Sequence, residues 1–158
     1  RSHSICSLYP HPLVTHTNIS SFEKWKILGS SKSNVIMNMC PIQDQHKQWI
    51  RQNDLSSHGA FNNLDYNFIP QFKPRVIESM MCKSVCLVKR DPWNVIENWF
   101  SPNEHFLYWE TLEELDSLIE SIDNDFESYS HIVESAFEEV KKYEIKNILN
   151  IIKGEVGE

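Results

Sequence analysis

Short apolar stretches that alternate with amphipathic ones constrain the fold of this chain most strongly. Apolar stretches at 33–40, 84–88 and 106–109 are each short and bounded by polar or turn-forming residues, which is typical of buried strands. Between and after them, apolar residues recur at helical spacing. Strands that are apolar on both faces and alternate with helices are typical of a parallel sheet covered on both sides. We therefore expect an α/β fold.

Helix-capping signals place several of the helices. Ser20 or Ser21 can cap a helix that ends near Gly29. Pro74 fits the first turn of a helix that continues to about residue 81. Thr111 and Glu114 have the spacing of a capping box. The expected helices are 21–29, 43–53, 74–81, a short one at 92–100 with Val95, Ile96 and Trp99 inward, 112–122, 126–140 and 145–152. Together, these strands and helices predict a Rossmann-like three-layer α/β/α domain with a short parallel sheet and a helical C-terminal tail.

The segment 54–71 is the least regular part of the chain. It is rich in Ser, His, Asn and Asp, with Phe and Tyr interleaved, and predicts a long loop. Long loops in compact domains are usually functional or mobile. Packing of this loop on a nucleobase is one possible role.

Length and charge narrow the class of protein. A chain of 158 residues is sufficient for one domain with its own core. Its net charge of -7 hides a split, because residues 1–90 carry 11 basic against 5 acidic side chains, whereas residues 91–158 carry 4 against 17. No apolar run is long enough to span a membrane. The basic residues match no nucleic-acid-binding motif, so we expect no nucleic acid as partner.

The N-terminus and the cysteines bear on location. No apolar signal core follows Arg1, and four cysteines without a secretory signal are typical of free thiols in a reducing compartment. Cys82 and Cys86 are separated by three residues, not by the two of a zinc knuckle or redox motif. We expect a cytoplasmic protein without a metal site.

One segment has the composition of an anion site. The chain contains no dinucleotide-binding glycine motif, Walker loop or nucleophile elbow. In open α/β sheets, ligands bind beyond the carboxyl ends of the strands, often with phosphate at the start of a helix. Lys73 and Arg75 flank Pro74 at such a start, and Glu78 follows one turn later, where it can accept two ribose hydroxyls. The plainer alternative is a solvated first turn with an Arg75–Glu78 pair worth a few tenths of a kcal/mol.

Five elements in order carry a family resemblance. They are Lys26–Lys32, Pro74–Val85, Phe100–Glu104, Phe106–Trp109 and Thr111–Leu115. In their order and spacing, the chain from Trp25 to about Asn147 resembles the C-terminal half of a GT-B glycosyltransferase, and is most similar to the CgeB-like and group 1 families. The chain would then be a single domain, 1–158, that resembles the donor-binding half and lacks the N-terminal half.

The resemblance implies a nucleotide-sugar site formed by Lys73, Arg75, Glu78 and Ser79. Glu78 matches the family acid that binds ribose or sugar hydroxyls, and Arg75 lies in the segment that faces the diphosphate. The fold implies no cofactor or metal. The catalytic residues are unknown, because the N-terminal domain usually supplies the base. Joined to such a domain, the chain would serve a hexosyltransferase-like enzyme that transfers a sugar from a nucleotide-diphosphate donor to an unidentified acceptor.

Two turns depart from the family pattern. The family usually has Gly where this chain has Lys83, which predicts a strained or altered turn. Its Pro-Gly turn is here Pro102-Asn103, a milder change because Asn tolerates positive φ.

The same sequence leaves other functions open. The acidic helices between 110 and 139 could be the partner surface of a non-catalytic interaction or regulatory module, which a large exposed apolar patch beside them would favour. A receiver-type domain lacks support, because no acids cluster at the strand ends. Lys89-Arg90 could contact phosphate, and Glu104 with His105 could face a donor sugar, although solvated positions are the plainer reading for these residues.

Overall fold

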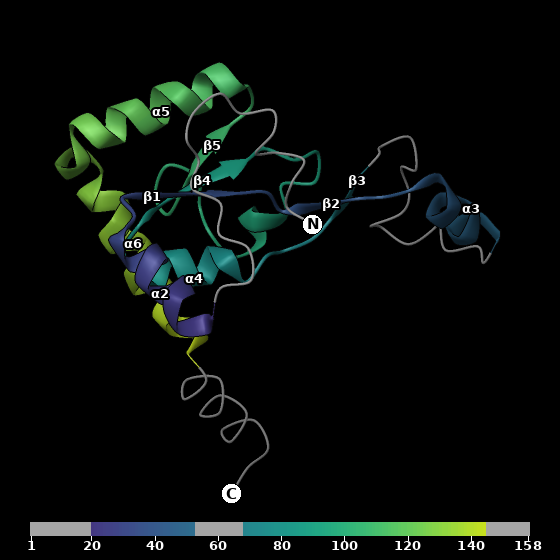
Figure 1. Cartoon of the computed structure of the whole chain (residues 1–158), viewed down its shortest axis with the longest axis horizontal. Coiled ribbons are helices and arrows are strands. Elements are labelled where there is room, and N and C mark those ends of the chain that lie inside the picture. Colours follow the sequence, from purple (N-terminus) through teal and green to yellow (C-terminus); the bar gives the residue numbers. More distant parts are fainter. Residues whose placement is uncertain (1–19, 53–67, 145–158) are drawn as a thin grey trace, which may run out of the picture.

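The centre of the fold is a parallel sheet of three strands. The structure, a computed structural model, describes residues 20–52 and 68–144 (Figure 1). Strands β1 (Ser33–Ile36), β4 (Val85–Lys89) and β5 (Leu107–Trp109) lie in the order β1-β4-β5. Ser33 pairs with Val85, and Leu87 pairs with Leu107, both in parallel register. Most of the expected loop 54–71 and the expected helix 145–152 lie outside the described residues.

Helices cover both faces of this sheet, as expected. Helix α5 (Leu112–Asn124) lies on one face, whereas α2 (Ser21–Ser30), α4 (Arg75–Met81) and α6 (Ser130–Val140) lie on the other (Figure 1). The central strand β4 is buried from Val85 to Val88 because its alternate side chains enter two different cores. One core combines Cys86 and Val88 with Val76, Met80, Phe106, Ala136 and Val140. The other combines Val85 and Leu87 with Trp109, Leu115, Ile122 and Val133. The α/β fold class is therefore confirmed.

Capping boxes start two of the helices where the sequence predicts them. The Ser20 side chain accepts the Glu23 N–H, and the Glu23 carboxylate accepts the Ser20 N–H in return. Thr111 and Glu114 make the same reciprocal pair at the start of α5. Such pairs satisfy N–H groups that have no partner inside the helix.

The expected strand 33–40 is two strands in two sheets. After β1 the chain leaves the parallel sheet, and β2 (Met39–Pro41) pairs antiparallel with β3 (Phe68–Pro70). The break falls at Asn38, which is fully buried and whose carbonyl accepts the Gln71 N–H. Between β2 and β3, the predicted polar helix forms as α3 (Asp44–Gln52).

The expected helix 92–100 is shorter than predicted. Only the 3-10 turn η2 (Val95–Asn98) forms, after Asn94 in the left-handed region at φ 49°. Ile96 and Phe100 enter the core, but Trp99 remains 41% exposed, so its predicted inward position is wrong. The turn ends at Asn98, and Trp99 has left the helical region at φ -130°, so its side chain does not continue the inward face that an α-helix over 92–100 would have given it.

The C-terminal described region is helical, with one interruption. The expected helix 126–140 is a 3-10 turn, η3 (Phe126–Tyr129), followed by α6 and by a second turn, η4 (Lys141–Tyr143). The Asp125 carboxylate accepts the Ser128 N–H and so caps η3 separately. Among the described helices, none has the length and apolar character required to cross a membrane.

Candidate functional site

The segment that leads into α4, residues 71–75, is hydrogen-bonded to Asn38 just beyond the carboxyl end of β1, and we call this segment the α4 entrance. Lys73 donates its backbone N–H to Oδ1 of Asn38 at 3.1 Å, and Gln71 donates its N–H to the Asn38 carbonyl at 2.9 Å. Because Asn38 is fully buried, these bonds fix the segment before α4 against the sheet edge. Asn38 is not among the site residues that the sequence predicts. The available signal was an amide side chain between two methionines within a mostly apolar run.

Lys73 and Arg75 lie at this entrance, as the sequence predicts. The Lys73 ammonium is 3.1 Å from Sγ of Cys40 and also contacts the side-chain oxygen of Gln71. Arg75 is the first residue of α4 and is exposed. Within the described residues, its guanidinium has no hydrogen-bond or ion-pair partner. The entrance therefore presents two cations, of which Arg75 is the freer.

Glu78 is paired with a residue from a different helix. Its Oε1 lies 2.5 Å from Nζ of Lys24, which comes from α2 (Figure 1). The side chains of Lys24 and Glu78 are 29% and 20% exposed, so the pair is partly screened from water. The alternative Arg75–Glu78 pair is not among the ion pairs of the described residues. An ionised carboxylate accepts up to about four hydrogen bonds, so Glu78 retains capacity for a hydroxyl ligand beside Lys24.

Ser79 lies apart from the other three predicted residues. It is fully buried where α4 packs on β4, beside the thiol of Cys86. Burial raises the pKa of the Cys86 thiol to about 12. The thiol is therefore protonated at neutral pH and unsuited to act as a nucleophile. Lys73, Arg75 and Glu78 face the outside of the α4 entrance, and Ser79 supports it from the core.

Asp91 is a further polar group at the carboxyl edge that the sequence analysis did not select. It lies two residues after the end of β4 and is only 2% exposed. Its Oδ1 accepts the Trp93 N–H at 2.9 Å, whereas its Oδ2 has no hydrogen-bond partner among the described residues. Burial raises the pKa of this carboxyl, and backbone N–H groups partly oppose that shift.

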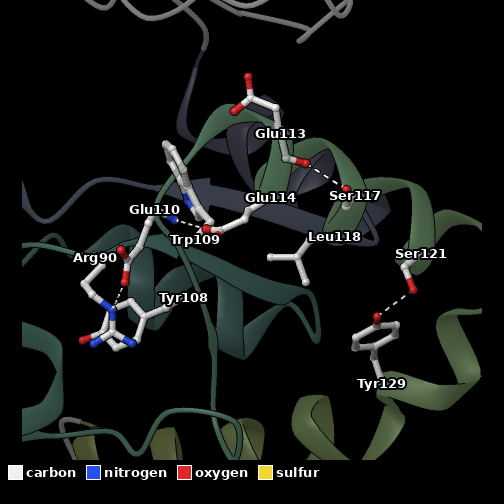
Figure 2. Close-up of a pocket in the computed structure, with 10 residues that line it drawn as sticks. All are labelled: Arg90, Tyr108, Trp109, Glu110, Glu113, Glu114, Ser117, Leu118, Ser121 and Tyr129. Carbon is white, nitrogen blue, oxygen red and sulfur yellow. Dashed lines mark hydrogen bonds and ion pairs between the residues drawn. The ribbon is translucent and has the colours of Figure 1, made fainter.

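A groove of about 630 Å³ lies elsewhere on the molecule, along α5 (Figure 2). None of the four predicted site residues lines it. Its lining comes from the ends of β4 and β5, from one side of α5 and from η3: Arg90, Tyr108, Trp109, Glu110, Glu113, Glu114, Ser117, Leu118, Ser121 and Tyr129. The groove and the predicted site at the start of α4 are therefore separate parts of the described structure.

Arg90, the cation at one end of the groove, already has two interaction partners. The Arg90 guanidinium lies 4.0 Å from the centre of the Tyr108 ring, and its Nε pairs with Glu110 at 2.8 Å. Tyr108 donates its hydroxyl to Glu97 at 2.9 Å, and burial together with this carboxylate raises the pKa of Tyr108. Lys89 contacts the Glu110 carbonyl and lies over the Trp109 ring. Lys89 and Arg90 therefore both have partners within the chain, and Arg90 keeps only its terminal N–H groups for a ligand.

His105 and Glu104 form a local contact and not an open site. His105 is 7% exposed, and its Nδ1 accepts the Ser101 N–H at 2.9 Å. Glu104 lies 3.8 Å from Nε2 of the same ring. In the described ranges 20–52 and 68–144, no group of three or more His, Cys, Asp or Glu side chains is arranged to hold a metal ion.

Comparison with known proteins identifies the family. No curated protein and no solved structure matches the chain. A family model described as glycosyl transferase-like matches residues 16–149, which include every element of the described fold. That match covers well over half of the sequence, and the chain belongs to the glycosyl transferase-like family.

Proposed function

We propose that this chain binds the nucleotide-diphosphate sugar donor of a glycosyl transfer at the α4 entrance. The observation that carries the proposal is the exposed guanidinium of Arg75, which has no partner among the described residues and lies at the carboxyl edge of a glycosyl transferase-like domain. Guanidinium groups bind phosphate oxygens through two parallel hydrogen bonds. Lys73 supplies a second positive charge two residues away.

Glu78 would bind the ribose of the donor. Its pairing with Lys24 fixes the carboxylate one turn beyond Arg75 while leaving acceptor capacity on the same group. A ribose presents two neighbouring hydroxyl donors, which match a carboxylate acceptor. With Arg75 and Glu78 one turn apart on α4, the phosphate and ribose groups would both bind to one short helix.

The chemical role of this site would be to stabilise the leaving diphosphate. Negative charge accumulates on that group as its bond to the sugar breaks, and fixed cations nearby lower the energy of the transition state. Lys73 and Arg75 would act in this way. A partner domain of GT-B type would supply the catalytic base and the other wall of the cleft, as the family resemblance implies.

The alternative of a non-catalytic interaction module receives less support. It predicts an exposed apolar patch beside the acidic helices. Among the described residues of α5 and α6, Leu112 is the one large hydrophobic side chain that is exposed. The other exposed ones, Phe22, Trp25, Phe68, Met81 and Trp99, belong to α2, β3, α4 and the end of η2. Of these elements α4 packs on α6, so Met81 is the further exposed apolar side chain next to the acidic helices.

Paired ribose and deoxyribose nucleotides test the proposal. The full chain would be titrated calorimetrically with UDP, GDP, ADP and the 2′-deoxy form of whichever binds. Wild-type protein should prefer the ribose form by about 10- to 150-fold, because a hydrogen bond to a charged group contributes about 1.5–3 kcal/mol. Glu78→Gln should remove most of that preference. Absence of binding by all three nucleotides, or an unchanged preference in the variant, would contradict the proposal.

A further inference from the structure

The groove along α5 has an apolar floor with polar groups at both ends. Leu118 lies between Tyr108 and Tyr129, which come from β5 and η3 (Figure 2). The Arg90–Glu110 pair forms one end, and the hydroxyls of Ser121 and Tyr129 form the other. Its volume of about 630 Å³ falls within the range of about 300–1,000 Å³ in which proteins hold small organic ligands.

The charge of the groove excludes an anionic ligand. Three glutamates, Glu110, Glu113 and Glu114, line it against the single cation Arg90, which is already paired. Backbone N–H groups lower the pKa of Glu114, so this carboxylate is ionised at neutral pH. The described residues 91–144, which supply most of the lining of the groove, carry 15 acidic against 2 basic side chains. A nucleoside diphosphate would be repelled, and the groove is therefore distinct from the proposed donor site.

The carboxylates are nevertheless poorly placed to bind a cation. Glu114 is occupied by the N–H groups of Glu110 and Thr111 at the start of α5. Glu110 is neutralised by Arg90, and Figure 2 shows the Glu113 carboxylate directed away from Leu118. The polar groups left for a ligand are hydroxyls and the remaining N–H groups of Arg90.

The two hydroxyls can serve a ligand as both donor and acceptor. Ser121 Oγ and Tyr129 Oη lie 2.8 Å apart, so one of their two protons bridges them and the other remains to be donated. Lone pairs on both oxygens also remain. Such a pair suits a ligand that carries hydroxyls of its own, whereas Leu118 and the Tyr129 ring suit the C–H face of a sugar ring.

From this lining we infer that the groove between β5, α5 and η3 binds a neutral saccharide. A pyranose combines an apolar face with neutral hydroxyls, which are the two properties that the floor and the ends of the groove match. The groove would hold the sugar acceptor, or an adjoining unit of an acceptor glycan. This assignment of the saccharide as acceptor rests on the proposed function, whereas its binding in the groove does not.

Nuclear magnetic resonance of the isotope-labelled full chain tests the inference. The probes are the methyl glycosides of glucose, galactose, mannose and N-acetylglucosamine, each added to tens of millimolar. At least one should shift the amide signals of Leu118, Ser121 and Tyr129 in a saturable manner, with a Kd on the order of millimolar. If none of the four shifts these amides, the inference is overturned.

Two conservative variants test the role of the hydroxyl pair. Ser121→Ala and Tyr129→Phe each remove one hydroxyl, and the second keeps the ring that packs against the core. Each should raise the Kd about three- to tenfold. The matched control is Ser30→Ala, an exposed serine on α2 whose hydroxyl donates to the Ile27 carbonyl, and it should change the Kd less than twofold. Equal Kd values for all three variants would overturn the inference.

Charged probes separate this site from the donor site in the same sample. UDP should shift amides near Arg75 and Glu78 and leave those of Ser121 and Tyr129 unchanged, and lysine amide should shift neither set. If UDP shifts neither set while a glycoside shifts the groove, the proposed donor function fails and the saccharide groove stands. If UDP or lysine amide shifts the groove amides as strongly as the glycosides do, the ligand class is wrong.

Discussion

The turn between α4 and β4 requires a left-handed backbone conformation at Lys83, and substitutions at this position can test it. Its φ of 56° lies in the left-handed region, which costs a residue with a Cβ atom about 1–2 kcal/mol. Two hydrogen bonds fix this conformation, because Lys83 donates its N–H to the Met80 carbonyl at 3.0 Å and Ser84 donates to the Ser79 carbonyl at 3.1 Å. This is the Schellman pattern, in which glycine is the usual residue.

Replacing Lys83 by glycine alone would change two contributions to stability at once, the contacts of the side chain and the strain of the backbone. The Lys83 ammonium pairs with Glu134 at 2.8 Å and lies 4.6 Å from the centre of the Phe137 ring. Exposed contacts of these kinds are worth up to about 1 kcal/mol each. Lys83→Ala removes both contacts and keeps the strained backbone, whereas Lys83→Gly removes both and relieves it. We expect Lys83→Gly to be more stable than Lys83→Ala by about 1 kcal/mol, after allowance for the greater freedom of unfolded glycine.

Urea unfolding of the two variants, followed by circular dichroism, measures this difference. In thermal unfolding it corresponds to a Tm higher by about 2–4 °C for Lys83→Gly in a chain of this size. Ser117 in the middle of α5 is the matched control, because there the helical backbone makes alanine more stable than glycine by about 1 kcal/mol. If alanine is the more stable residue at both positions, the left-handed turn at Lys83 is refuted.

Two further substitutions test the buried polar groups. Burial raises the pKa of the Asp91 carboxyl in the folded state above its ordinary 3.8, so the folded state binds the carboxyl proton more tightly than the unfolded state does. The free energy of unfolding of the wild type should therefore fall relative to that of Asp91→Asn as the pH rises through the acid range. Urea unfolding at several pH values measures this, and a difference that is constant or grows in favour of the wild type would contradict it. The Ser84 hydroxyl lies 2.9 Å from the Leu28 carbonyl and 2.7 Å from the Ser31 carbonyl, and it satisfies these acceptors where α2 ends. Ser84→Ala should therefore lower the free energy of unfolding by about 1–3 kcal/mol. A loss below about 0.5 kcal/mol in the same assay would show that these carbonyls find other partners.

Local sequence signals predicted the elements whose structure depends on neighbouring residues. Thr111 and Glu114 are three residues apart and made their capping box as expected. The apolar run at 84–88 became β4, because a strand buried on both faces needs no polar alternation. Lys83 and Asn103 both take positive φ at the turns where the family resemblance expected glycine.

The features that the sequence did not reveal depend on contacts between distant residues. Asn38 ends β1 because its backbone and side chain bind the segment 71–73, more than thirty residues away. The partner of Glu78 is Lys24, 54 positions earlier, and not the nearby Arg75. The groove likewise requires α5 and η3 to pack beside β5, which periodicity alone does not specify.

The most direct test of the central claim compares two arginines. Arg75→Gln and Arg90→Gln remove the same charge. Arg75 lies at the start of α4 without a partner in the part of the chain that the structure describes, whereas Arg90 is paired with Glu110. For the nucleoside diphosphate that binds best, calorimetry should give a Kd about 10- to 150-fold weaker for Arg75→Gln and within about twofold of wild type for Arg90→Gln. Equal Kd values for both variants and the wild type would contradict donor binding at the α4 entrance.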